Sequence, residues 1–268
     1  MINCIVTGAA GRMGRRIIDI LLETDGIDVG CATERTGHEI VGMDVGDYLG
    51  LGKKGCSISD NFADVLAHGD VIIDFTFPEV SLDNLKLASK KGKAMVIGST
   101  GFSAEQLKEI KKLSKKCAVV LAPNMSVGVN LLLKVLSEMA SVLDEDYDID
   151  IVETHHRHKK DAPSGTALKM AQVIAAARGK DLDKVGVFSR HGNIGERKRG
   201  EIGIQTLRIG DVVGDHTVIF GSMGERIEIT HKASSRDVFA RGAVRAAQWV
   251  AGRAPGLYDM QDVLGIKG

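Results

Sequence analysis

Short apolar runs rich in β-branched residues alternate with amphipathic stretches from Ile2 to about Pro123. This alternation is typical of βα units that build a parallel sheet. It predicts strands at Ile2–Thr7, Asp28–Thr33, Val71–Phe75, Ala94–Gly98 and Cys117–Ala122, separated by helices at Gly11–Glu23, Pro78–Lys91 and Ser103–Lys116. The third and fifth strands are continuously apolar, which indicates that both faces of the sheet are covered. We therefore expect a doubly wound, Rossmann-like α/β domain.

The pattern changes after Asn124. It predicts helices at Val129–Leu143, Thr166–Arg178 and Asp237–Gly252, and strands at Tyr147–Thr154, Ile204–Ile209, His216–Phe220 and Glu225–His231. These strands alternate apolar and polar residues, which favours a mixed or antiparallel sheet of about four strands in a second, α+β domain. We expect domains at residues 1–126 and 127–235, with residues 236–268 returning as a helix to the first. Two glycine-rich stretches, Gly37–Gly55 and Gly186–Gly203, show no period and predict long loops.

Composition narrows the class of partner and the compartment. The chain has 35 Lys and Arg against 35 Asp and Glu, and this zero net charge argues against a nucleic-acid or membrane-surface partner. Its four cysteines lack metal-binding spacing and read as reduced core residues. No apolar stretch approaches the ~18 residues of a membrane-spanning helix, and the N-terminus shows no signal-peptide pattern. We therefore expect a cytoplasmic protein.

A glycine-rich turn follows the first predicted strand: Gly8, Ala9, Ala10, Gly11, Arg12, Met13 and Gly14. A turn of this kind lets backbone N–H groups approach a pyrophosphate at a helix N-terminus. Glu34 and Arg35 follow the second strand, where a carboxylate binds a ribose diol and an arginine can pair with a 2′-phosphate. We therefore expect NADH, NADPH or both as cofactor. A simple strand-to-helix turn and a solvated charged pair are the alternatives.

Two further strand ends carry small and polar residues, at the edge where such a sheet places its ligand. They are Gly98, Ser99 and Thr100, and Ala122, Pro123, Asn124 and Met125. We expect these loops to lie on the nicotinamide side of the cofactor.

Side chains able to bind anions or transfer protons are most concentrated in the segment from Glu153 to Thr166. It holds three histidines and three cations within six residues. His156, His158 and Lys159 suit one carboxylate, and Ser164, Gly165 and Thr166 form a helix N-terminus that suits another. A zinc site is an alternative, but only His156 and His158 lie on one side of an extended segment. A solvated basic turn is another. We expect a small dianionic substrate, reduced by hydride and protonated by this cluster, with no metal.

These motifs resemble the dihydrodipicolinate reductase family over essentially the full length. The segment from Glu153 through Asp161-Ala-Pro-Ser-Gly-Thr-Ala167 is the most specific, and Asp74-Phe-Thr-Phe-Pro-Glu79 and His231-Lys-Ala-Ser-Ser-Arg236 also match. The resemblance implies NAD(P)H-dependent reduction of 4-hydroxy-tetrahydrodipicolinate in the diaminopimelate route to lysine, by a homotetramer formed through the second domain. Met125 departs from a common Phe, and Lys160 from a common aliphatic residue.

The resemblance also implies roles for individual residues. His155 is the expected proton donor and acceptor, and Lys159 is the second proton-donating residue. His156, Gly165 and Thr166 match substrate-carboxylate contacts, shared with Lys159 and Ser164. The cofactor contacts match Gly8 to Met13, Glu34, Arg35, Gly98 to Thr100 and Ala122 to Met125. A reductase of another small dicarboxylate and a non-enzymatic dinucleotide sensor are the competing hypotheses.

Overall fold

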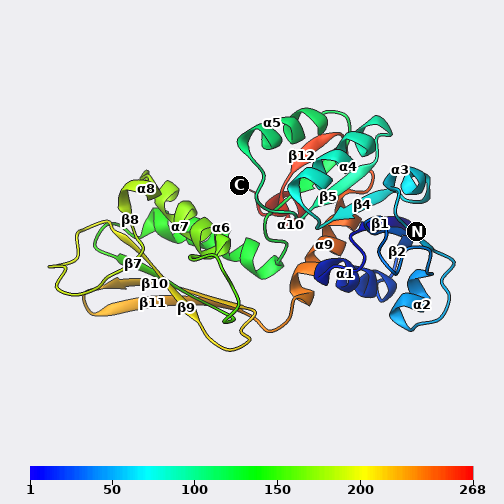
Figure 1. Cartoon of the computed structure of the whole chain (residues 1–268). Helices are drawn as coiled ribbons and strands as arrows, with labels where there is room; N and C mark the ends of the chain where they lie inside the picture. The colour runs from blue at the N-terminus through cyan, green and yellow to red at the C-terminus, as the bar shows by residue number, and fades with distance from the viewer. Residues whose placement is uncertain (268) are drawn as a thin grey trace. The chain divides into compact units, whose positions relative to one another are not determined.

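The computed structural model describes residues 1–267, and the chain forms two compact units (Figure 1). Unit 1 comprises Met1–Val127 and Arg236–Gly268, and unit 2 comprises Gly128–Ser235. Within residues 1–267, no helix is both long and apolar enough to cross a membrane. The four cysteines are buried and free.

Unit 1 is built on a parallel sheet of seven strands in the order β12-β6-β5-β4-β1-β2-β3. The strands are β1 (Ile2–Thr7), β2 (Ile27–Thr33), β3 (Ile58–Ser59), β4 (Val71–Asp74), β5 (Ala94–Ile97), β6 (Ala118–Leu121) and β12 (Gly256–Tyr258). The helices are α1 (Arg12–Leu22), α2 (Val45–Leu49), α3 (Phe62–Val65), α4 (Pro78–Lys90), α5 (Ala104–Leu113), α9 (Asp237–Val250) and α10 (Met260–Leu264), with a 3₁₀ turn at Leu66–His68. The predicted Rossmann-like class is confirmed. The edge strands β3 and β12 were missed because two or three residues carry no readable period.

Burial explains why these segments form this sheet. Every residue of β4 and β5 is buried, as expected for central strands with both faces covered. Helix α9 packs against α1, β4 and β5, so the end of the chain completes the core of unit 1. A Cβ on Gly242 of α9 would lie 1.8 Å from the carbonyl oxygen of Met125, so only glycine permits this approach. Arg16 of α1 also holds Asp237 through two hydrogen bonds of 2.8 Å.

The expectation of a long loop at residues 37–55 was partly wrong, because the segment contains helix α2. Asp44 caps this helix, and its carboxylate also binds the chain that returns after it. It accepts hydrogen bonds from the backbone N–H groups of Gly46, Asp47, Lys54, Gly55 and Cys56, at 2.7–3.4 Å. One side chain therefore organises a stretch that lacks hydrophobic periodicity.

Unit 2 is built on a mixed sheet of five strands in the order β11-β10-β7-β9-β8, rather than about four. The strands are β7 (Asp148–His155), β8 (Gly186–Val187), β9 (Ile202–Arg208), β10 (Gly214–Ser222) and β11 (Glu225–Ala233). The helices are α6 (Val127–Val142), α7 (Gly165–Ala177) and α8 (Leu182–Val185). β7, β9 and β8 are parallel, whereas β10 is antiparallel to β7 and β11.

Strand β8 lies in the second predicted loop, residues 186–203, which is therefore less irregular than expected. Arg190 also fixes this segment to the sheet, because its guanidinium donates to Asp150 of β7 at 2.7 Å. Arg197 donates to the same carboxylate. These two arginine contacts with Asp150 explain how a glycine-rich segment without an apolar pattern is fixed to the sheet.

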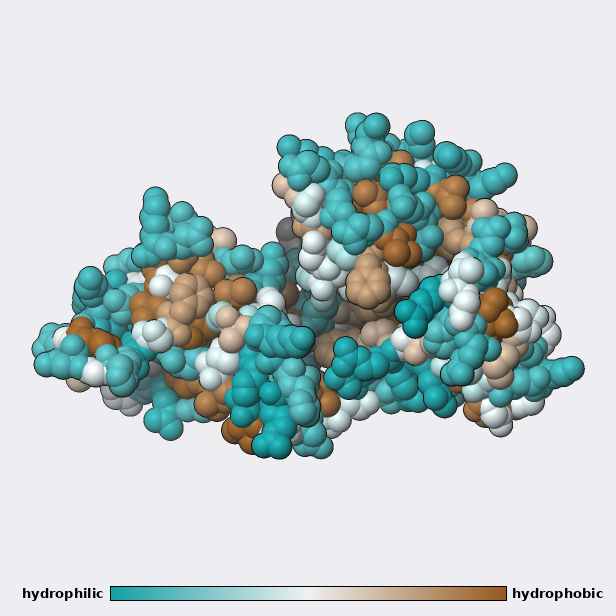
Figure 2. Space-filling view, in the orientation of Figure 1, coloured by the Kyte–Doolittle hydropathy of each residue, from teal (hydrophilic) through white to brown (hydrophobic). Residues whose placement is uncertain are grey.

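The core of unit 2 lies between α6, α7 and one face of the sheet (Figure 1). Alternate residues, among them Ile149 and Ile151, point into this core, while Val152 and Thr217 pair on the opposite face. No helix of residues 128–235 covers that opposite face in Figure 1. On the side drawn in Figure 2, hydrophobic residues form small separate groups among hydrophilic ones.

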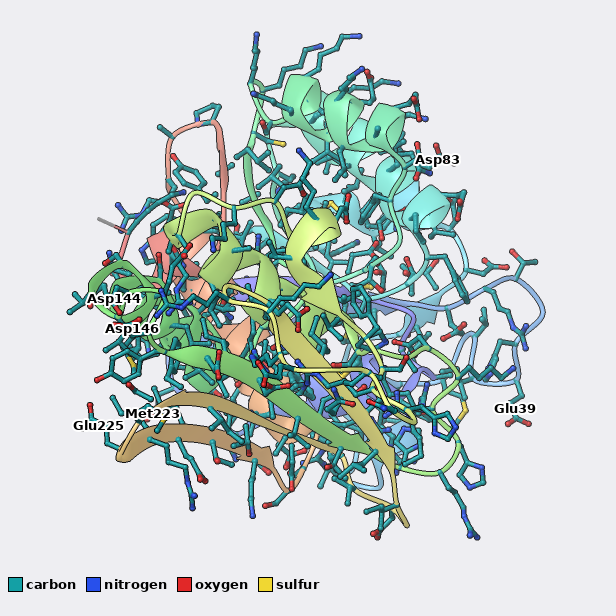
Figure 3. The ribbon with its side chains drawn as sticks, turned by 90° about the vertical axis from the view of Figure 1, so that its left-hand side faces the viewer. Glu39, Asp83, Asp144, Asp146, Met223 and Glu225 are labelled. Atoms are coloured by element: carbon teal, nitrogen blue, oxygen red, sulfur yellow. The ribbon has the colours of Figure 1, made fainter. Side chains whose placement is uncertain are left out.

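The β10–β11 turn lies beside the loop between α6 and β7. Figure 3 shows Met223 and Glu225 near Asp144 and Asp146, and the hydroxyl of Tyr147 donates a hydrogen bond to Glu225. Met223 is 99% exposed at the tip of the turn. This end of the sheet is therefore tied to the chain that enters β7.

Candidate functional site

The predicted dinucleotide turn joins β1 to α1 in unit 1. Gly8 has a φ of +70°, which favours glycine. A Cβ on Gly14 would lie 2.0 Å from the carbonyl oxygen of Gly8, so the helix approaches the turn closely. Gly11 is the N-cap residue of α1 and provides no side-chain cap. The first N–H groups of α1, at Arg12 and Met13, therefore suit a phosphate anion.

Glu34 contacts this turn directly. Its carboxylate accepts hydrogen bonds from the backbone N–H of Ala10 at 2.8 Å and of Arg35 at 3.0 Å. Ala9 is buried, and its N–H donates to Thr33 at 3.0 Å. The end of β2 and the glycine turn are thus held together, and Arg35 lies exposed beside them.

The loop after β5 is held by Asp74. This buried residue belongs to a motif that matches the family, but the sequence alone predicted no role for it. Its carboxylate accepts hydrogen bonds from the hydroxyls of Thr76 at 2.6 Å, Ser81 at 2.7 Å and Ser99 at 3.4 Å. A Cβ on Gly98 would lie 2.2 Å from the Phe75 ring. Ser99 is therefore fixed by its partners, whereas Thr100 is exposed.

The loop after β6 continues the same edge of the sheet. The N–H of Ala122 donates to the carbonyl of Ile97 at 3.1 Å, and Asn124 accepts from the N–H of Ser126 at 2.9 Å. Pro123 is exposed, but Met125 is 1% exposed. Met125 packs beneath α9, so its side chain contributes to the core of unit 1.

The His/Lys segment begins at the end of β7 in unit 2. The Nδ1 atom of His155 lies 2.5 Å from the carboxylate of Glu153, two residues earlier on the same face of the strand. The rings of His156 and His158 follow with centroids 6.3 Å apart. The ammonium of Lys159 donates to Asp161 at 2.9 Å. Lys160, the departure noted in the sequence, is exposed.

Ser164 caps α7 and connects it to this segment. Its hydroxyl accepts a hydrogen bond from the N–H of Ala167 at 3.1 Å and lies 3.0 Å from Nε2 of His216. Gly165 is exposed and Thr166 is half-buried, so the first turn of α7 has an accessible side. A helix N-terminus of this kind suits a carboxylate.

Sequence reasoning missed two neighbours of this segment, Arg208 and His216. The guanidinium of Arg208 donates to both carboxylate oxygens of Glu153, at 2.9 and 3.0 Å. His216 packs edge-on against His155 with ring centroids 5.2 Å apart. Both come from strands remote in sequence. The alternation along β9 and β10 could have indicated which face of the sheet they share, but not the register that brings them near His155.

Burial and charge set the protonation of two of these groups. Burial opposes ionisation of Glu153, but hydrogen bonds from His155, Arg208 and the N–H of Ser164 outweigh it and lower the pKa of the carboxyl to about 2. Burial and then the charge of His155 lower the pKa of His216 to about 4. At neutral pH the carboxylate of Glu153 is therefore ionised and His216 is neutral.

The candidate residues thus form one group in each unit. Those for the cofactor lie at one edge of the unit 1 sheet, and those for proton transfer and substrate lie around the end of β7 and the start of α7. No group of three or more His, Cys, Asp or Glu among residues 1–267 is arranged to hold a metal ion.

Comparison with known proteins identifies the family. Models of the N-terminus and C-terminus of dihydrodipicolinate reductase match residues 2–125 and 128–264. Relatives from Syntrophus aciditrophicus (strain SB) and Hahella chejuensis (strain KCTC 2396), both named 4-hydroxy-tetrahydrodipicolinate reductase, are 55% and 53% identical over 267 residues, covering 100% of each chain. The solved dipicolinate-bound dihydrodipicolinate reductase from Paenisporosarcina sp. TG-14 shares the fold, with a TM-score of 0.78 at 24% identity over 98% of each chain. The sequence resemblance is confirmed, and the chain belongs to the dihydrodipicolinate reductase family.

Proposed function

We propose that this protein reduces 4-hydroxy-tetrahydrodipicolinate to tetrahydrodipicolinate with NADH or NADPH, in the diaminopimelate route to lysine. One hydride and one proton add to the substrate, and its 4-hydroxyl group is lost as water. The observation that carries the proposal is that His155 and Lys159 lie in the segment that leads into the first turn of α7, where Gly165 is exposed. The cluster supplies protons and the helix supplies an anion site, the two requirements of reducing a small dicarboxylate. The full-length similarity to curated reductases supports the same substrate.

The cofactor contributes one step, since bound NAD(P)H supplies a hydride to the unsaturated ring. The chain's own residues bind and protonate. We assign His155 and Lys159 to protonation, from an imidazole nitrogen and the Nζ ammonium, and His156 to one substrate carboxylate. The first turn of α7, at Gly165 and Thr166 with Ser164, holds the other, assisted by Lys159.

The geometry of unit 1 supports the proposed cofactor residues. The N–H groups of the turn from Gly8 to Met13 suit the pyrophosphate, and Glu34 suits a ribose diol. Arg35 suits a 2′-phosphate, which would allow NADPH as well as NADH. The loops at residues 98–100 and 122–125 are assigned to the nicotinamide side. The reaction proposed needs no metal ion.

We further propose a homotetramer assembled through the sheet face of unit 2 that its helices leave open. Val152, Thr217 and Leu207 contribute to that face or its edge, and Leu207 is 44% exposed. Light scattering of the purified protein tests this assembly. A cytoplasmic location agrees with four buried, free cysteines.

The test of the function is NAD(P)H oxidation on addition of freshly made 4-hydroxy-tetrahydrodipicolinate. Rapid oxidation with this substrate and little with other small dicarboxylates is expected. Equal rates across a dicarboxylate panel would indicate a different reductase, and cofactor binding without turnover would indicate a dinucleotide sensor.

A further inference from the structure

Glu153 is a buried carboxylate contacted by hydrogen-bonding groups of four residues, His155, Ser164, Thr206 and Arg208. The residue is 0% exposed. One oxygen, Oε2, faces Nδ1 of His155 at 2.5 Å and Nη1 of Arg208 at 2.9 Å. The other, Oε1, accepts from the N–H of Ser164 at 2.9 Å, from Nη2 of Arg208 at 3.0 Å and from the hydroxyl of Thr206 at 3.2 Å. Such a carboxylate is satisfied only when it is ionised.

An ionised carboxylate accepts hydrogen bonds and cannot donate them. Nδ1 of His155 must therefore carry the proton that it shares with Glu153, and the exchangeable position of the ring is Nε2. Within residues 1–267, no group bonds to Nε2. The Glu153 contact thus fixes both the tautomer and the orientation of the imidazole.

Gly214 provides independent evidence that the ring has one required position. It lies in β10 outside the left-handed region, so backbone conformation does not demand glycine there. A Cβ at this position would lie 2.9 Å from Nε2 of His155 and 3.3 Å from Cδ2. The absence of a side chain on Gly214 keeps the Nε2 edge of His155 uncrowded.

The same carboxylate also holds the proposed anion site. Oε1 of Glu153 binds the N–H of Ser164, the residue that caps α7. Arg208 extends this link, since its Nη2 donates to the carbonyl oxygen of Asp161 at 2.5 Å. One side chain therefore sets the position of the proton donor relative to the helix that would hold the substrate carboxylate.

We propose that Glu153, held by Arg208, is the positioning residue of this enzyme, fixing the Nδ1–H form of His155 and the start of α7 in one network. This inference rests on the proposed function, because it assigns the geometry of the same site. The charged or titratable groups around His155 are Glu153 on β7, which bonds to the ring, and His216 on β10, which packs against it. Arg208 on β9 acts through Glu153, and Lys159 and His231 act on His216. Among the residues that the structure describes, Glu153 alone forms a hydrogen bond with the ring.

The first experiment is Glu153→Gln with Thr206→Val as the matched control. Glutamine keeps the shape but has one acceptor oxygen, so it cannot serve His155, Arg208 and Ser164 together. We expect kcat to fall by about 10²-fold, the lower end of what a general acid contributes. We also expect its pH profile to move, since the negative charge beside the imidazole is lost, while the Kd for NAD(P)H stays unchanged. Thr206→Val removes a single hydrogen bond to Oε1 and keeps kcat within about threefold.

A second measurement does not depend on activity or on a stable variant. Nitrogen NMR of the wild-type protein labelled at histidine reports which imidazole nitrogen carries the proton. We expect His155 to show Nδ1–H in its neutral form, and Glu153→Gln, where folded, to show a mixture of tautomers. An Nε2–H tautomer in the wild type overturns the proposal, as does a Glu153→Gln variant with wild-type kcat and pH profile.

The two proposals fail in distinguishable ways. Wild-type protein that does not oxidise NAD(P)H with 4-hydroxy-tetrahydrodipicolinate refutes the function, whereas the NMR result on His155 still decides the role of Glu153. An active wild type with an Nε2–H tautomer refutes only the positioning role.

Discussion

The carboxylate of Glu34 accepts a hydrogen bond of 2.8 Å from the backbone N–H of Ala10. Glu34 follows β2, and Ala10 lies in the glycine turn between β1 and α1. The contact therefore joins two residues that are 24 positions apart in sequence. The carboxylate proposed to bind a ribose is therefore fixed against the loop proposed to hold a pyrophosphate. Arg35, the next residue, donates its N–H to the same carboxylate and leaves its guanidinium exposed.

The first prediction concerns cofactor choice. Arg35→Ala removes the guanidinium but not the N–H that binds Glu34, so the turn stays in place. We expect the KM for NADPH to rise by roughly 10- to 100-fold, the effect of losing a charge-assisted hydrogen bond of about 1.5–3 kcal/mol, while the KM for NADH changes little. Steady-state kinetics with each cofactor provides the measurement. Equal effects on both cofactors would show that Arg35 does not read the 2′-phosphate.

The second prediction concerns the two proposed proton donors. We expect His155→Gln and Lys159→Ala each to lower kcat by ~10²–10⁴-fold, because each removes a group that transfers a proton. Binding of NAD(P)H, followed by fluorescence titration, should stay close to wild type, since these residues lie in unit 2. Lys160→Ala is the matched control, because Lys160 is the exposed neighbour of Lys159. Near-wild-type turnover in both donor variants would refute their assignment.

Much of the fold could be predicted from the sequence, because burial of a strand on one or both faces sets its pattern of apolar residues. The continuously apolar β4 and β6 and the alternating β7 all lie within one residue of their predicted ends. The segment around α2 was not readable, since Asp44 organises it through backbone hydrogen bonds that leave no periodic pattern.

The candidate site was predictable only in its contiguous part. His155 to Thr166 form one stretch of sequence, and so do the residues of the glycine turn. Arg208 and His216 reach the site through the pairing of β9 and β10 with β7, in a register that sequence alone does not fix. Glu153 was visible in the motif, but its proposed role depends on its burial and on the hydrogen bonds from Arg208.

The third prediction uses the missing side chain of Gly214. In Gly214→Ala the new methyl group would lie 2.9 Å from Nε2 of His155, so the imidazole has to move. Misplacing a catalytic group by about 1 Å can cost 10²-fold in rate, and we expect kcat to fall by roughly 10- to 100-fold. The thermal midpoint and the Kd for NAD(P)H should change little.

Gly221→Ala is the control for this variant. Gly221 lies on the same strand, but a Cβ there meets no atom within 4 Å. We expect its kcat to stay near wild type. A loss of kcat in Gly221→Ala equal to that in Gly214→Ala would show that glycine content of the strand, not space at His155, limits the rate.

The last prediction concerns stability and pH. Burial and the charge of His155 lower the pKa of His216 from 6.5 to about 4. Between these two pH values the unfolded chain binds a proton at His216 that the folded chain does not bind. The resulting stabilisation is fully present above pH 6.5 and is lost as the pH falls towards 4. For a residue 3% exposed it amounts to about 3 kcal/mol in the free energy of unfolding.

Urea denaturation at several pH values across this window measures the effect, with His216→Asn as the comparison. Asparagine cannot titrate and retains an amide that can bond to Ser164, so its free energy of unfolding should fall less between pH 6.5 and 4 than that of the wild type. Glu153 contributes the same sign of dependence in both proteins, but below its ordinary pKa of 4.5, since its folded pKa is about 2. Parallel curves for wild type and variant above pH 4.5 would therefore show that His216 is not the group that titrates.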